Sequence, residues 1–198
     1  MTQQAATTVL RRTVATVAAL NIAYYCIEFA VARAIGSVSL FADSVDFLED
    51  ASVTTLVLVA VGMTATFRRI AGLGFVGLLM VPSIAALWTA LDKFSHPTPA
   101  DPLQLTLTAI GALIVNGYCA YLLAKVRDTG GSLSKAAFLS ARNDTFANIA
   151  MIGAGAATAA TLSIWPDVIV GLAIAALNAG AAFEVYEAAQ GETDHENN

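Results

Sequence analysis

The chain contains 198 residues, of which 57% are hydrophobic and only 13% are charged, and its net charge is −5. An ordinary soluble domain has about 25% charged residues, so this composition excludes one. Together with a mean hydropathy of +0.69, it predicts an integral membrane protein. Nucleic acid is not a partner that such a chain would bind.

Charged residues and prolines divide the sequence into six apolar blocks, each of about the 20 residues that cross a bilayer. The blocks lie at about 13–34, 38–63, 70–92, 102–124, 136–161 and 165–185. Continuous runs of this length are typical of helices rather than of the shorter alternating strands of membrane barrels. We therefore predict an all-α membrane protein, a bundle of six transmembrane helices forming one domain over 1–198, with an acidic tail at 186–198.

Lysine and arginine indicate the orientation, because they collect on the cytoplasmic side of membrane proteins. Those on one predicted side are Arg11, Arg12, Arg68, Arg69, Lys125, Arg127 and Lys135. Lys93 and Arg33 fall on the other side. We expect both termini to be cytoplasmic and the protein to lie in the inner or plasma membrane.

The second block carries four acids within eight residues, Asp43, Asp46, Glu49 and Asp50. Each aspartate at the centre of a span costs about 2.5–3.5 kcal/mol on insertion scales, so packing alone does not explain them. At 100° per residue, the three aspartates lie within about 60° of one another. Asp46 and Asp50, four apart, can direct oxygens to a single point, as a metal site requires. Their mutual repulsion makes exchange of a metal for protons physically natural.

The fifth block supplies a second polar face. Ser140, Asn143, Asp144 and Asn148 share one side of a helix, and Arg142 points away from it. At 1.5 Å per residue, Asp50 and Asp144 both fall near the middle of the bilayer. The residues thus predict a carboxylate-lined site between the second and fifth helices.

Polar residues in other blocks have less specific roles. Asn21 and Glu28 are seven residues apart on one face of the first block, and Asn116 lies in the fourth. We interpret Asn21 and Asn116 as interhelical hydrogen-bond partners. Glu28 is either a proton acceptor or the counter-ion of Arg142, and the sequence leaves both open.

Several motifs together resemble the cation diffusion facilitator family of metal/proton antiporters along essentially the whole chain. They are Asn21, Tyr25 and Glu28, the run 36–50 with its Ala-Asp-Ser-Val-Asp-Phe-Leu-Glu-Asp core, the segment from Trp88 to Phe94 with Pro97, Val115 and Asn116, the segment from Ser140 to Asp144, and the segment from Trp165 to Gly171. The acidic run is the specific part of the resemblance.

The resemblance implies a transport site of two residues four apart on the second helix and two on the fifth. These positions are Asp46, Asp50, Ser140 and Asp144. Asp43 and Asn143 are weaker candidate ligands. Many members have histidine where this chain has Ser140, and a site without imidazole is rich in oxygen and suits harder cations. Zinc, cobalt, iron(II) and manganese all remain open as the transported cation.

Two departures from the family pattern shape the expected assembly. Many relatives carry a His-rich loop between the fourth and fifth helices and a soluble domain after the sixth. Here the segment 125–135 has no histidine, and the chain ends about a dozen residues past the last block. We expect a short form without the cytoplasmic domain, whose homodimer, if formed, would depend on helix contacts. Expected partners are the lipid bilayer, the cation and protons, with no permanently bound cofactor.

We therefore predict a divalent cation transporter that mediates efflux from the cytoplasm by cation/proton antiport, not an enzyme. One alternative is a transport-inactive subunit that binds metal or a partner, suggested by Ser140. Another is an intramembrane aspartyl protease that uses Asp50 and Asp144. This second alternative is disfavoured because such proteases typically carry Gly-x-Gly-Asp, whereas Asp144 follows Ala-Arg-Asn.

Overall fold

The computed structural model describes residues 3–60, 83–126 and 131–178, and all regular secondary structure within these ranges is helical. The helices are α1 (Gln3–Ile35), α2 (Val38–Ala60), a helix over 83–95, α4 (Pro102–Ala124), α5 (Gly131–Thr161) and a last helix, Trp165–Asn178. The prediction of an all-α helical bundle is confirmed. Parts of three predicted spans, the acidic tail 186–198, and Arg68, Arg69 and Arg127 lie outside the described residues.

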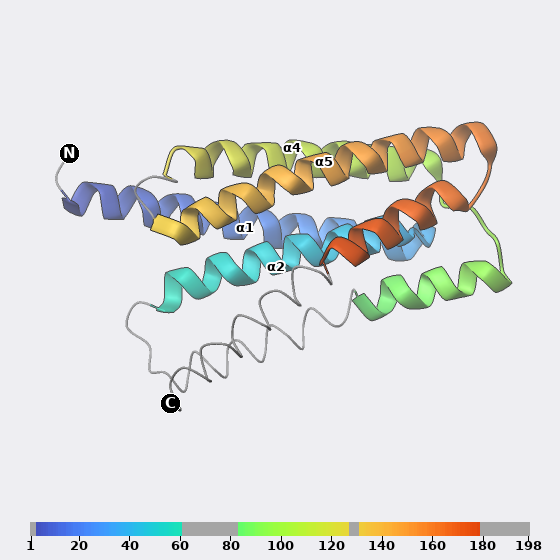
Figure 1. Ribbon diagram of the computed structural model, residues 1–198, viewed down its shortest axis with the longest axis horizontal. Helices are drawn as coiled ribbons and strands as arrows, with labels where there is room; N and C mark the ends of the chain where they lie inside the picture. Colours follow the sequence, from blue (N-terminus) through green and yellow to red (C-terminus); the bar gives the residue numbers. More distant parts are fainter. Residues whose placement is uncertain (1–2, 61–82, 127–130, 179–198) are drawn as a thin grey trace, which may run out of the picture.

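The helices run side by side along the long axis of the molecule (Figure 1). α1 packs against α2 and α4, and α5 packs against α4 and α2. Leu40 of α2, Leu105 of α4 and Met151 of α5 are fully buried in a common apolar cluster. The last helix, orange to red in Figure 1, lies beside α2, and this places α2 in the interior of the bundle.

A glycine turn sets α1 and α2 against each other. Gly36 has φ +62°, a left-handed conformation that glycine adopts without steric cost. The N–H of Ser37 donates to the carbonyl of Ala32 over 3.1 Å, which is the hydrogen bond of a Schellman helix end. Only one residue later α2 begins, so the two helices form a tight antiparallel pair.

Two helices begin earlier than their predicted apolar blocks. α1 starts at Gln3 rather than near residue 13, and α5 starts at Gly131 rather than near residue 136. Arg11 and Arg12 are therefore part of α1. Hydropathy marks where a helix needs an apolar surface, whereas helix formation itself also suits Gln, Ala, Leu and Arg.

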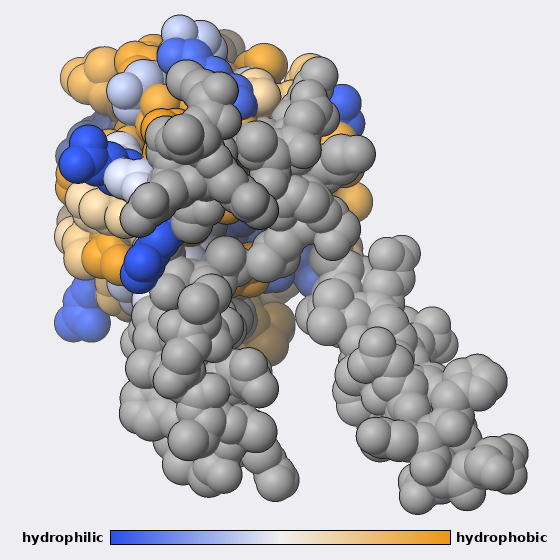
Figure 2. Space-filling view, turned by 90° about the vertical axis from the view of Figure 1, so that its left-hand side faces the viewer, coloured by the Kyte–Doolittle hydropathy of each residue, from blue (hydrophilic) through white to orange (hydrophobic). Residues whose placement is uncertain are grey.

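The outside of the bundle is apolar. Trp88, Leu103, Ile114 and Phe146 are each between 64% and 73% exposed, and Figure 2 shows apolar side chains over much of the coloured surface, interrupted by polar patches. Within the described ranges, α1 over Thr8–Ile35 and α4 are long and apolar enough to cross a membrane. So large an exposed apolar area is what a lipid environment covers.

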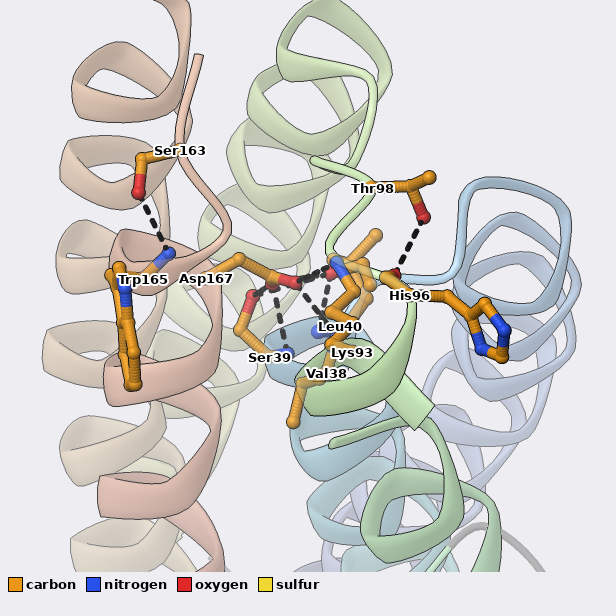
Figure 3. A network of polar contacts seen from close by, with 10 residues as sticks. Val38, Ser39, Leu40, Lys93, His96, Thr98, Ser163, Trp165 and Asp167 are labelled. Carbon is orange, nitrogen blue, oxygen red and sulfur yellow. Dashed lines mark hydrogen bonds and ion pairs between the residues drawn. The ribbon is translucent and has the colours of Figure 1, made fainter. Parts of the chain in front are cut away.

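One buried carboxylate, Asp167 of the last helix, accepts hydrogen bonds from the first backbone N–H groups of α2 (Figure 3). Its Oδ2 accepts from the N–H of Val38 over 2.9 Å, and its Oδ1 accepts from the N–H of Ser39 over 3.0 Å. The hydroxyls of Ser37 and Ser39 each donate to Oδ1 over 2.7 Å, and the N–H of Leu40 donates to Ser37 Oγ over 3.2 Å. The free donors at this helix end are thus satisfied by side chains, as a buried helix start requires.

Lys93 joins the same group from the helix over 83–95. Its ammonium lies 3.1 Å from Asp167 Oδ2, and both side chains are almost completely buried. Gly171, one turn further along the last helix, permits the close approach, since a Cβ there would lie 2.7 Å from the backbone nitrogen of Ser39. Three helices therefore meet at one neutralised carboxylate, which we call the Asp167 node: Ser37, Val38, Ser39, Lys93 and Asp167.

Replacing Asp167 by alanine should strongly destabilise the protein. The change removes the acceptor of five hydrogen bonds and leaves Lys93 charged and buried without a partner. Breaking a buried ion pair from one side costs about 3–5 kcal/mol, so we expect a clear drop in the melting temperature of the purified protein in detergent. Asp92→Ala is the matched control, because Asp92 pairs with His96 at the surface. Equal melting temperatures for the two variants would contradict the role of the node.

Candidate functional site

A cavity of about 630 Å³ lies between α2, α5 and the last helix. The polar wall that α2 and α5 contribute consists of Asp46, Glu49, Asp50, Ser140, Asn143 and Asp144. The last helix contributes mainly apolar side chains, among them Val170, Ile174 and Leu177. The cavity is large enough for a cation with part of its hydration shell. Its polar groups come from α2 and α5, apart from Asn178 at the end of the last helix.

Helical periodicity explains why these residues share one wall. Asp46, Glu49 and Asp50 are spaced i, i+3 and i+4 on α2, and Ser140, Asn143 and Asp144 repeat that spacing on α5. Residues at such spacing lie on one face of a helix. The two faces meet where Ser140 Oγ donates to Asp50 Oδ1 over 2.9 Å. The structure thus brings together Asp46, Asp50, Ser140, Asp144 and Asn143.

Asp43 is not brought to the cavity. Its side chain is fully buried, and both of its oxygens accept from Asn148 Nδ2, over 3.1 and 3.0 Å. Asn148, expected on the polar face of α5, does not line the cavity and donates to Asp43. Glu49, which the sequence analysis did not offer as a ligand, lines the cavity.

The cavity is acidic, and its polar lining consists of carboxylate, hydroxyl and amide side chains. Four of its lining residues are carboxylates, and none of the lining residues is basic. Carboxylate, hydroxyl and amide oxygens are ligands for hard divalent cations. Across the described ranges, no three His, Cys, Asp or Glu side chains are already gathered closely enough to hold a metal ion. A cation would therefore have to draw these side chains together.

The structure decides one interpretation that the sequence left open. Glu28 is fully buried whereas Arg142 is exposed, and they form no ion pair among the described residues. The interpretation of Glu28 as the counter-ion of Arg142 is therefore wrong. Asn21 and Asn116 are both buried and face other helices: Cys119 Sγ lies 3.6 Å from Asn21 Oδ1, and Asn116 Nδ2 donates to Asn148 Oδ1 over 3.2 Å.

The Asp167 node was not predicted. Lys93 was assigned only to the outer side, and Asp167 was noted only as part of a motif that opens the sixth block. The sequence feature that could have indicated it is a lone aspartate in the first turn of an apolar helix, where an unpaired charge is costly. Nothing in the sequence indicates that this partner is 74 residues away.

Comparison with known protein families identifies one match. The family described as the cation efflux transmembrane domain matches residues 14–189, a range that contains every residue of the cavity wall. No curated protein matches the chain.

Replacing Ser140 by histidine should change the affinity of the cavity for metals. The imidazole would enter the wall one turn from Asp144 and opposite Asp50, and zinc gains more from a nitrogen ligand than manganese does. We expect zinc to bind about tenfold or more tightly while manganese changes little, measured by calorimetry on the purified protein. Thr161→His places the same side chain at an exposed position on the same helix and should leave both affinities unchanged. A similar gain in both variants would contradict the assignment of Ser140 to the site.

Proposed function

The chain belongs to the cation efflux family, and on this premise we propose that it exports divalent metal cations from the cytoplasm in exchange for protons. Members of the family are integral membrane transporters of metal cations rather than enzymes. The valence of the cation, the exchange for protons and the direction are our proposal. The observation that carries it is the acidic cavity built by α2 and α5 inside an apolar bundle.

Electrostatics supports exchange rather than simple binding. The four carboxylates of the cavity wall face one another with no basic residue among them. In a low-dielectric interior such charges repel strongly, so they require neutralisation either by protons or by a cation. The two are alternatives at the same oxygens, which makes entry of a divalent cation compete with bound protons. The proposed ligands are Asp46, Asp50 and Asp144, with Ser140 and Asn143 as further oxygen donors.

The distribution of positive charge supports an orientation with both termini in the cytoplasm. Arg11 and Arg12 lie near the start of α1, and Lys125 follows the end of α4. The start of α1 and the end of α4 lie at the same end of the bundle (Figure 1). Under the positive-inside rule this end faces the cytoplasm. We propose the inner or plasma membrane as the location, with any homodimer held by helix contacts.

A non-transporting relative remains the second candidate function. Ser140 uses its hydroxyl to donate to Asp50, and the imidazole found at this position in many relatives is absent. On this alternative the chain binds metal or a partner subunit without moving a cation. Ser140→His separates the two readings: an inactive relative gains transport from none, whereas a working carrier changes only its selectivity.

Uptake into proteoliposomes with an imposed pH gradient tests the proposed function. We expect gradient-driven uptake of at least one of zinc, cobalt, iron(II) and manganese by the native chain, and loss of that uptake in Asp50→Ala, because one ligand and one proton-binding group are removed together. Asp92→Ala removes an exposed carboxylate outside the cavity and should retain uptake. Failure of the native protein to carry any of the four ions would favour the non-transporting relative.

A further inference from the structure

A chain of buried polar side chains crosses four helices outside the cavity. Asn116 of α4 donates to Asn148 of α5 over 3.2 Å, and Asn148 donates to both oxygens of Asp43 of α2 over 3.1 and 3.0 Å. The carboxyl group of Glu28 of α1 lies within hydrogen-bonding reach of Asp43. All four side chains are at most 2% exposed. None of them belongs to the cavity wall.

The carboxyl group of Glu28 has no hydrogen-bond donor beside it among the described residues. Among the described residues, neither of its oxygens has a hydrogen-bond donor as a partner, and the group that faces it, Asp43, can only accept when ionised. Two ionised carboxylates in contact inside an apolar bundle repel each other strongly and lose their hydration. Buried polar groups are almost always hydrogen-bonded. A positive charge between Glu28 and Asp43 would remove this repulsion.

A proton fits this position better than a metal ion does. A hard metal cation takes about six or more oxygen ligands. Both Asp43 oxygens already accept from Asn148, and the Asn148 oxygen already accepts from Asn116. Only the two Glu28 oxygens remain without a partner, too few for a metal and sufficient for a proton.

The direction of the hydrogen bonds shows which group carries the proton. The Asn148 amide donates to both oxygens of Asp43, and such donation stabilises the ionised form of a carboxyl group. Glu28 accepts from no donor in the described part of the chain. We propose that Glu28 and Asp43 form a proton-binding site separate from the cavity, in which protonated Glu28 donates a hydrogen bond to ionised Asp43.

The titratable groups around this pair do not supply another positive charge. Those acting on Glu28 or Asp43 are Tyr24 on α1, Asp46 on α2 and Asp144 on α5, and α4 contributes the neutral Asn116. None of these groups is basic.

The proton site lies next to the cavity along two helices. Asp43 is three residues before Asp46 on α2, and Asn148 is four residues after Asp144 on α5. A divalent cation in the cavity would repel the proton on Glu28, which makes this pair a source of one exchanged proton. This link rests on the proposed function, whereas the protonation of Glu28 rests on the packing alone.

Infrared spectroscopy of the full chain in lipid nanodiscs, without metal and at neutral pH, tests the protonation. We expect the carbonyl-stretch band of a protonated carboxylic acid that shifts in heavy water and is lost in Glu28→Gln. The glutamine keeps an N–H donor for Asp43, so the fold should be preserved. The band should persist when sodium is replaced by choline, which excludes a bound alkali ion. Asp92→Asn, which changes an exposed carboxyl, should leave it unchanged.

A carbonyl region that is identical in the native protein and in folded Glu28→Gln would overturn the proposal. Asp43→Asn provides a second variant: Glu28 then donates to an amide oxygen instead of a carboxylate, so the band should remain but move to a different frequency. An unmoved band in that variant would also overturn it.

Proton release on addition of zinc, followed with a pH indicator in weakly buffered nanodiscs, tests the link to transport. We expect Glu28→Gln to bind zinc and to release fewer protons per bound ion than the native chain. Equal release would remove Glu28 from the exchange. If the native chain binds no zinc but the infrared band is lost in Glu28→Gln, the proposed function fails for zinc while the proton site stands.

Discussion

The position of α2 depends on the contact between its first turn and the carboxylate of Asp167. The N-terminus of a helix carries partial positive charge and free N–H groups, and burying it without an acceptor would be costly. Asp167 provides that acceptor from another helix, and Lys93 neutralises the remaining charge from a third. Because Asp46 and Asp50 follow on the same helix, this contact also sets their depth in the bundle and their distance from the last helix, which forms the opposite wall of the cavity.

The acids of the described helices are neutralised to different extents. Asp167 has a lysine and two backbone amides. Asp43 has an asparagine amide and, on our proposal, the proton of Glu28. The acids of the cavity wall have only Ser140 and one another among the described residues. Charge that the fold itself does not neutralise is therefore concentrated in the cavity, and this is where a mobile cation gains most from binding.

The contrast between Asp43 and Asp46 shows the limit of helical geometry as a guide. Both lie on one side of α2 when angles are counted along the helix, and the sequence offered both as ligands. In the bundle, Asp43 meets the amide of Asn148 whereas Asp46 opens onto the cavity. Angles along a helix say which residues share a face, but the neighbouring helices decide how that face is divided between a closed contact and a cavity.

The sequence by itself determined the membrane class, the all-helical architecture and the polar faces of the second and fifth helices, because hydropathy and helical periodicity are local properties of the chain. Only the tertiary structure decided that Asp167 and Lys93 form a buried ion pair. It also decided that Glu28 faces Asp43 rather than Arg142, and that Asn148 donates a hydrogen bond to Asp43. These contacts join residues that lie 15 to 105 positions apart. Their partners are chosen by how the helices pack, which no local pattern encodes.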